Sequence, residues 1–483
     1  MAKRSVIVQF TPTAAGFAAT AESAAGSLIN IPGLTPDPSF GVVDIPGSAP
    51  SPAAASFDPF AVDDVEPTPT RYITRAEIEV EDAERIEREN PGVEIYSDPV
   101  IEPCIICPGS PAMGNTATVA SLIGRAQLQA AGMTGKNVLL AIVDTGFNLQ
   151  YLRSHGVTAP FDATRSWVPR AGLVPGNLPV NHGTMCAFDA TIGAPQATLL
   201  DIALLQSTRP GATIMDGLLS DAVLAYRHLL NVMNAPRRPG ELRSMVVNNS
   251  WGMFHSSWDF PVGSPGNYSH NPNHPFNVIV GTLAKAGADI LFAAGNCGRD
   301  CPDSRCKGVT NAGIVGANSH CEVISVAGVD ATKTRVGYST SGPGALCRMK
   351  PDIASFTHFA GSGVYAADGG TSAATPVAAG VVAAFRSKFH YNPLDARTSS
   401  AAVRAVVQRT AEDRGAVGYD FDYGYGVING RRLAAVSALS IEAPFDITAI
   451  SRQETAAFEQ EMAANIKANE SYEIAVRRAA AAA

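Results

Sequence analysis

Ser372 stands where a serine side chain could act as a nucleophile. It lies in a run of small residues, 369–380, that continues into an apolar stretch, which predicts a tight turn opening a buried helix with Ser372 in its first turn. A helix N-terminus presents unpaired N–H groups and a positive dipole end, which suit the oxyanion that a serine nucleophile creates. We expect Pro376 in the same turn, where its missing N–H costs little. For a lone Gly-Thr-Ser, an N-cap serine on a core helix is the more common explanation.

Three further residues supply the groups that a serine nucleophile requires. Asp144 ends an apolar run, His182 opens a predicted helix, and Asn296 ends a second apolar run. Acyl transfer needs an imidazole to accept the hydroxyl proton and a carboxylate to orient that imidazole. It also needs a hydrogen-bond donor for the oxyanion, which is worth roughly 3–4 kcal/mol. Taken singly, each residue has a structural explanation as a cap, a turn residue or a satisfied buried histidine.

The elements that would position these residues alternate between strands and helices. Apolar runs predict strands at residues 138–143, 198–205, 244–252, 289–296 and 323–329, and helices are predicted at 118–131, 214–233 and 277–286. Such alternation implies an α/β fold with a parallel sheet and helices on both faces. Ligands bind at the carboxyl ends of such strands, which is where Asp144 and Asn296 are expected.

Composition excludes several classes of protein. The chain has 483 residues, of which 46% are hydrophobic and 17% charged, and its net charge is −8. The negative charge argues against a nucleic-acid partner, and no apolar run is long enough to span a bilayer. The first ten residues lack the apolar segment of a secretory signal peptide. We therefore expect a cytoplasmic location or export by a route that uses no signal peptide.

The N-terminal region has a different character. Residues 12–70 are rich in Pro, Ala, Ser and Gly and predict a long loop or linker. Strands are expected at residues 6–10, 71–80 and 93–98, with a charged helix at 81–90. The unit at 71–101 is too small to be stable alone, so we expect it to dock on the rest of the protein as an accessory lobe.

The chain resembles the subtilisin-like serine proteases, the subtilases. Residues 142–146 (IVDTG), 182–184 (HGT), 293–296 (AAGN) and 370–376 (GTSAATP) match the family's aspartate, histidine, oxyanion-asparagine and serine motifs, in the family's order. The resemblance covers roughly residues 116–439. It implies a subtilisin-like three-layer fold with a mostly parallel central sheet, plus a small α+β N-terminal pro-domain. It also implies that Ser372 is the nucleophile, His182 the general base and acid, Asp144 its orienting partner and Asn296 the oxyanion donor.

The resemblance extends to substrate binding, with two departures. Ser250, Trp251 and Gly252 match the family's substrate-binding strand, which pairs with extended peptide and borders the specificity pocket. Trp251 replaces a common Leu and is expected to reshape a subsite, and Ala373 replaces the usual Met after the serine. The family often binds structural calcium, but no loop here maps to those sites, so we expect no cofactor and assign no metal ligand.

The resemblance further implies that residues 71–101 belong to a propeptide. Such a region acts as an intramolecular chaperone and inhibitor, and its last residues lie in the active-site cleft until the enzyme cuts them. We therefore divide the chain into a pro-region at 1–108, a catalytic domain at 109–440 and a C-terminal helical extension at 441–483. In the extension, Phe458, Met462 and Ile466 form an apolar stripe at helical spacing.

The eight cysteines leave several interpretations open. Cys104 and Cys107 form a lone C-x-x-C motif, which is a weak signal for zinc or redox chemistry. Cys301 and Cys306 are the pair expected to bridge, because only four residues separate them. Reduced thiols in a cytosolic enzyme are the competing interpretation.

The predicted function is that of a serine endopeptidase, made as an autoinhibited zymogen, that acts on protein or peptide substrates. Two alternatives remain open at the level of sequence. The acyl-enzyme could be passed to an amine, which would make the protein a peptide ligase or macrocyclase. The fold could also serve as a catalytically silent binding or assembly component, although all four catalytic groups are present.

Overall fold

The structure is a computed structural model that describes residues 3–10, 31–45, 71–103, 110–206, 217–236 and 243–436. The described residues fall within one compact unit, Met1–Ile441. The predicted C-terminal extension and most of the 12–70 insert lie outside the described residues, as do Cys104 and Cys107. In the described part of the chain, no helix has both the length and the apolar character that crossing a membrane requires.

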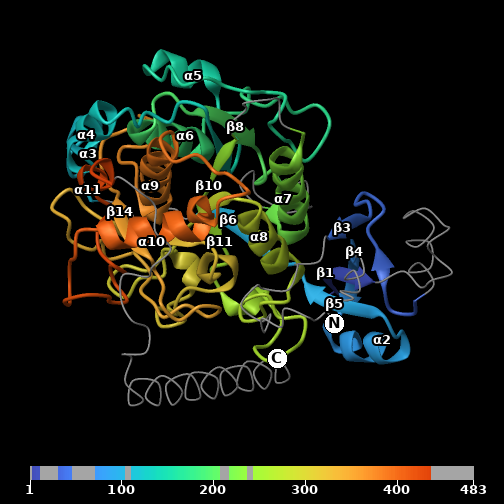
Figure 1. The fold of residues 1–483 in the computed structure, drawn as a ribbon. Helices are drawn as coiled ribbons and strands as arrows, with labels where there is room; N and C mark the ends of the chain where they lie inside the picture. The colour runs from blue at the N-terminus through green and yellow to red at the C-terminus, as the bar shows by residue number, and fades with distance from the viewer. Residues whose placement is uncertain are drawn as a thin grey trace, which may run out of the picture. The chain divides into compact units, whose positions relative to one another are not determined.

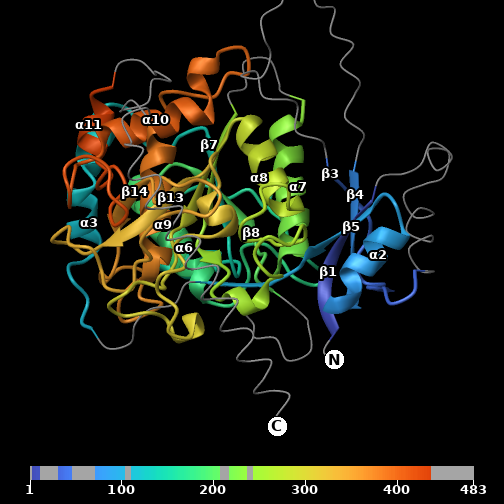
Figure 2. The same ribbon diagram turned by 90° about the horizontal axis from the view of Figure 1, so that it is seen from below.

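A parallel six-stranded sheet forms the centre of the main domain, the name used here for the described residues from 110 onward (Figures 1 and 2). Its strands, in spatial order, are β14 (Ile353–Phe356), β13 (Ile324–Val329), β12 (Ala288–Ala293), β10 (Ser244–Asn249), β7 (Val138–Val143) and β8 (Thr198–Ile202). The chain moves from β7 to β8 on one side and then returns to β10 on the other. The order of strands therefore reverses at β7, and a ligand crevice is expected at the carboxyl ends beside such a reversal.

Helices cover both faces of this sheet, as the fold class predicts. Along β7, Val138, Leu140 and Ile142 belong to one buried cluster, whereas Leu139, Ala141 and Val143 belong to another. The first cluster includes residues of α3 (Thr116–Leu122), α4 (Arg125–Ala130), α5 (Leu149–Ser154), α6 (His182–Gly193), α9 (Gly370–Arg386), α10 (Ser400–Thr410) and α11 (Gly430–Ala434). The second includes residues of α7 (Leu219–Asn234) and α8 (Pro275–Lys285). The three-layer α/β fold expected from the sequence is therefore confirmed.

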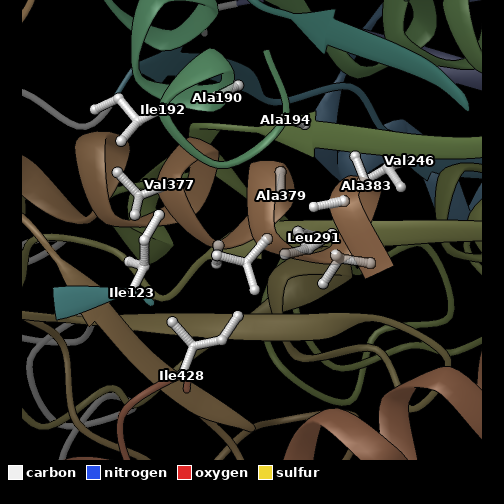
Figure 3. Packing of buried hydrophobic residues seen from close by; sticks show 14 of the residues in the cluster. Ile123, Ala190, Ile192, Ala194, Val246, Leu291, Val377, Ala379, Ala383 and Ile428 are labelled. Atoms are coloured by element: carbon white, nitrogen blue, oxygen red, sulfur yellow. The ribbon is translucent and has the colours of Figure 1, made fainter. Parts of the chain in front are cut away.

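Helices α6 and α9 lie in direct backbone contact. A methyl group on Gly380 of α9 would overlap the carbonyl oxygen of Ala190, and one on Gly193 of α6 would overlap the backbone at Gly380. Small side chains line the same contact, including Ala190 on α6 and Ala379 and Ala383 on α9 (Figure 3). The packing of small residues thus holds the helix that begins with His182 against the helix that contains Ser372.

The N-terminal lobe is a separate antiparallel sheet backed by one helix. Its elements are β1 (Lys3–Phe10), β2 (Thr35–Pro36), β3 (Val43–Ile45), β4 (Arg71–Glu79), the short 3-10 helix η2 (Val80–Asp82), α2 (Ala83–Glu89) and β5 (Val93–Ser97). One sheet face packs on Ile86 of α2, while Ile7, Ile73 and Tyr96 on the other face belong to the same buried cluster as α7 and α8. Figures 1 and 2 both show the lobe beside these two helices. The expectation that residues 71–101 dock on the main domain is confirmed.

The segment after the lobe enters the main domain as a strand. Strand β6 (Val100–Pro103) lies between β9 (Gly217–Leu218) and β11 (Trp251–Gly252) and is antiparallel to both. Both outer strands belong to the main domain. The segment therefore fills a slot between two strands that would otherwise present unpaired backbone groups.

Several predicted boundaries differ from the structure. Residues 118–131 form two helices, because Gly124 takes a left-handed φ of 73° between α3 and α4. The helix expected from residue 214 begins at Leu219, because the preceding two residues pair with β6. Part of the predicted linker is ordered as well, since Phe40, Val43 and Ile45 are buried in the core.

Candidate active site

The structure brings the four sequence-predicted site residues to the carboxyl-end edge of the sheet. Asp144 follows β7, Asn296 lies three residues after β12, His182 is the first residue of α6, and Ser372 is the third residue of α9. All four side chains are buried. Residues from distant parts of the chain thus meet where the strand order reverses.

The aspartate and the histidine form a close pair. Nδ1 of His182 lies 2.8 Å from one carboxylate oxygen of Asp144 and 3.0 Å from the other. The N–H of Thr145 donates to the same carboxylate at 2.7 Å, which holds its orientation. Gly183 makes the approach feasible, because a side chain there would overlap the Gly146 carbonyl oxygen in the turn after Asp144.

The serine side chain lies beside the strand that follows β10. Its Oγ donates to the carbonyl oxygen of Ser250 at 3.3 Å. Within the described residues, Nε2 of His182 is buried and has no hydrogen-bond partner. The imidazole therefore has its outer nitrogen available, while Asp144 orients the inner one.

Pro376 corrects one sequence expectation and explains a contact. It is the seventh residue of α9 rather than a first-turn residue. Because proline has no N–H, the carbonyl of Ser372, four residues earlier, loses its helical partner. The hydroxyl of Ser250 donates to that carbonyl at 3.0 Å, and Sγ of Cys186 lies 3.6 Å from it. Because of the proline, the Ser372 carbonyl of α9 is left to contact the side chains of Ser250 and Cys186.

Asn296 contacts the turn that leads to the serine. Its side-chain oxygen accepts hydrogen bonds from the N–H and the hydroxyl of Thr371, both at 3.0 Å. Engaging the oxygen in this way leaves the NH₂ group as the end of the amide that can donate. Thr371 is a positioning residue that the sequence analysis missed, although its place next to Ser372 in the motif was a signal.

Cys186 is a second residue beside the site that the sequence analysis did not assign. Its thiol is buried one helical turn after His182, and Sγ lies 3.6 Å from Asp144 Oδ2 and 3.8 Å from His182 Nδ1. Burial, together with the negative charge of Asp144, raises the pKa of the Cys186 thiol. Potential ligand atoms of these three side chains all lie within 4.8 Å of one another. The spacing from His182 could have indicated this position, because residues four apart share one helix face.

The predicted substrate strand is occupied by the chain itself. Trp251 lies opposite Pro103, and Gly252 lies opposite Glu102, across an antiparallel pairing. The indole of Trp251 is fully buried against the rings of Phe276 and Phe292, with centroid distances of 5.7 and 5.3 Å. Trp251 belongs to the same buried cluster as Ile101 of β6.

The disulfides differ from the expected pair. Cys306 bonds to Cys297, directly after Asn296, and Cys321 bonds to Cys347. The predicted Cys301–Cys306 bridge is therefore wrong, although Cys301 is itself disulfide-bonded. The prediction relied on the short spacing in the sequence, whereas the fold brings the Cα atoms of Cys297 and Cys306 to 5.7 Å from each other.

Comparisons with known proteins agree with this geometry. The model of a family described as the subtilase family matches residues 135–426. Subtilisin E of Bacillus subtilis is 27% identical over 309 residues, which cover 62% of this chain and 67% of that protein. Subtilisin DY of Bacillus licheniformis is 28% identical over 315 residues, covering 64% and 94%. A calcium-dependent protease of Trichormus variabilis is 26% identical over 356 residues, covering 65% and 48%.

Proposed function

Because the chain belongs to the subtilase family and is a subtilisin-like serine protease, we propose that Ser372, His182 and Asp144 are its catalytic triad. The observation that carries the assignment is the buried His182–Asp144 pair at 2.8 Å beside the helix that contains Ser372. Ser372 Oγ attacks the peptide carbonyl while His182 Nε2 accepts the hydroxyl proton. Asp144 stabilises the imidazolium, which then gives the proton to the leaving amine. Water then attacks the carbonyl of the acyl-enzyme while His182 accepts its proton, and His182 returns that proton to Ser372 Oγ as the acid product leaves.

We also propose that Asn296 stabilises the oxyanion of the tetrahedral intermediate. Its oxygen is held by Thr371, so the NH₂ group is the donor end of the side chain. Ser372 lies in the first turn of α9, where backbone N–H groups have no intrahelical partner. A side-chain donor in such a site contributes about 3–4 kcal/mol to the transition state.

The N-terminal lobe is proposed to be an intramolecular inhibitor, which makes the described protein a zymogen. Support comes from β6, which occupies the strand position beside Trp251 and Gly252 that the family uses for substrate. Residues 100–103 pair as a substrate would, on the N-terminal side of the reacting bond. We place the activating cut after Pro103 and before α3, within the 101–116 interval indicated by the sequence.

Polar contacts between the lobe and the main domain support the same role. The carboxylate of Asp98 accepts hydrogen bonds from the N–H and the hydroxyl of Ser220, in the first turn of α7, at 2.9 and 2.8 Å. An anion is favoured at a helix N-terminus. Arg75 pairs with Asp221 at 2.9 Å, and Nε2 of His274 lies 2.8 Å from the carbonyl of Ser97. These contacts hold the lobe in a position from which the chain continues into β6, between β9 and β11.

Hydrolysis is favoured over the two alternatives. The match to the subtilase family supports an endopeptidase, and no observation favours a ligase or a silent binding component. Of the two locations expected from the sequence, we propose export, because disulfides such as Cys297–Cys306 and Cys321–Cys347 suit an oxidising compartment better than the cytoplasm.

The experiment that tests the proposed function compares the wild-type chain with Ser372→Ala. Loss of the nucleophile is expected to lower the turnover of a peptide substrate by about six orders of magnitude. Intact mass should show that wild type is cut after Pro103 upon activation, whereas the variant keeps its full length. Mass spectrometry of the peptide distinguishes cleaved from cyclised products. Equal hydrolysis by the two proteins would refute the triad.

A further inference from the structure

Asp189 is a buried carboxyl group that the proposed catalytic mechanism does not use. It lies on α6, seven residues after His182 and three after Cys186, and its side chain is completely buried. Residues at these spacings share one side of a helix. Asp189 therefore points from the same face of α6 that carries the catalytic histidine.

Its polar contact is a second buried carboxyl group. Among the described residues, no hydrogen-bond donor reaches either oxygen of Asp189. The neighbouring side chain is Asp368, which is also fully buried, and the two carboxyl groups can hydrogen-bond to each other once one of them carries a proton. Asp368 lies immediately before the Gly369 N-cap of α9, the helix that contains Ser372. The two carboxyls thus connect the helix of His182 to the turn that leads to Ser372.

The surroundings of the two carboxyl groups are unequal. Asp368 accepts hydrogen bonds from the N–H of Ser362 and, at 2.7 Å, from its hydroxyl. Two such donors stabilise the ionised form of Asp368, whereas Asp189 has none within the described part of the chain. Two ionised carboxylates in contact, away from water, would repel each other strongly. The contact becomes favourable when Asp189 stays protonated and its O–H group donates a hydrogen bond to the carboxylate of Asp368.

We propose that Asp189 and Asp368 share one proton and that this hydrogen bond positions the helix of His182 against the turn leading to Ser372. The inference rests on the proposed function, because it assigns a role relative to the triad. Asp189 is the neutral donor and Asp368 the charged acceptor. The hydrogen bond between them therefore joins two parts of the active site that are distant in sequence.

The charges that face the pair are consistent with this assignment. Burial and the neighbouring Asp368 raise the pKa of Asp189 far above its ordinary value. Asp368 also has a raised pKa because it is buried, although the donors of Ser362 and the charge of His182 oppose that rise. Asp144, Cys186 and Tyr365 are the other titratable groups at this site. In the described residues, neither carboxyl forms an ion pair with a lysine or arginine.

Infrared spectroscopy tests the proton directly, on the full-length Ser372→Ala chain so that no cutting occurs. At pH 8 we expect a carbonyl band of a protonated carboxyl group that disappears in the additional variant Asp189→Asn. The control is Asp201→Asn, which removes another buried carboxyl, one that accepts the Gly176 N–H at 2.7 Å. The control should keep the Asp189 band. An identical band in the Asp189→Asn spectrum would overturn the proposal.

Kinetics in the otherwise wild-type chain tests positioning. Asp189→Asn retains an N–H donor to Asp368, so kcat should stay within about threefold of wild type. Asp189→Leu removes the donor and is expected to lower kcat at least about tenfold, with KM changed less. As pH rises and the shared proton is lost, wild-type kcat should fall, and this alkaline decline should be absent in Asp189→Asn. The same alkaline decline in both proteins would contradict the proposal even if the Leu variant fails to fold.

These outcomes are separate from failure of the triad assignment. If Ser372→Ala retained full activity, the proposed function would fall, whereas the infrared band of Asp189 would remain measurable. If the band were missing while Ser372→Ala was inactive, only the proton-sharing pair would be refuted.

Discussion

Pro103 lies directly opposite Trp251 in an antiparallel pairing that joins the N-terminal segment to the main domain. Ser250, the residue immediately before Trp251, accepts the hydrogen bond from Ser372 Oγ through its carbonyl oxygen. The register of β6 therefore places Pro103 opposite the residue that follows Ser250, which contacts Ser372. The proposals of self-inhibition and of self-cleavage therefore both rest on this β-pairing.

Asn296→Ala is expected to lower kcat by about 100- to 1000-fold, with KM little changed, because the amide is proposed to bind the oxyanion and not the ground-state substrate. Steady-state kinetics of the activated enzyme measures this split. Asn318→Ala is a matched control, since that buried amide donates to the carbonyls of Trp251 and Ala293 at 2.8 and 2.9 Å. The control should mainly affect KM and stability. Equal kcat values for Asn296→Ala and wild type would remove Asn296 from the mechanism.

Asp98→Ala should weaken docking of the lobe. The change removes the acceptor for Ser220 and Ser5 and leaves Arg75 without one of its carboxylate partners. Hydrogen bonds to a charged group contribute about 1.5–3 kcal/mol each, so peptide hydrolysis by the uncut chain should rise at least about tenfold. Initial rates with freshly prepared protein measure the effect.

The control for that experiment is Asp82→Ala on the same lobe. Asp82 is partly exposed, and among the residues that the structure describes its ion-pair partner is Arg85 of its own lobe at 2.9 Å. It should leave the initial rate unchanged. If the two variants behaved alike, Asp98 would have no special part in docking.

Acid is expected to promote release of the lobe through His274. Burial lowers the pKa of His274 from 6.5 to about 4 in the docked state. A group with a lowered pKa binds fewer protons when docked than when released, so docking weakens as pH falls from about 6.5 towards 4. Protonation would also remove the ring nitrogen that accepts the N–H of Phe276. The appearance of the cut form, followed by intact mass, should be several-fold faster at about pH 4.5 than at pH 7.

His274→Gln should flatten this pH dependence, because glutamine does not titrate in the range. His320→Gln is the control, since the pKa of His320 is also lowered to about 4 but its charged neighbours include Lys350 and Arg404 of the main domain. That variant should keep the acceleration in acid. Loss of the pH dependence in the control alone would assign the effect to the main domain.

Peptide mapping without reductant should identify the Cys297–Cys306 and Cys321–Cys347 bridges and reveal the partner of Cys301. Cys186 should react with an alkylating reagent only after denaturation, because its thiol is buried. Replacing Cys297 and Cys306 together by serine is expected to cost about 2–4 kcal/mol of stability. Recovery of a Cys301–Cys306 peptide would contradict the structure.

The sequence by itself determined the fold class and the four candidate catalytic residues. Buried parallel strands are continuous apolar runs, such as residues 138–143, so they can be recognised from the sequence alone. Local motifs also carried the aspartate, histidine, asparagine and serine, because each must sit at a strand end or a helix start. The fold and the family are confirmed, whereas the roles of these residues and the domain boundaries stay predictions.

Only the tertiary structure decided the contacts between distant segments. The pairing of Asp189 with Asp368, the bridge from Cys297 to Cys306, and the ordering of Val43 within a Pro-rich insert leave no local signal. Sequence patterns report which face of an element is apolar, but not which other element covers it. Tertiary packing therefore determines which groups contact a buried carboxyl or thiol group, since close approach depends on the whole arrangement of helices and strands.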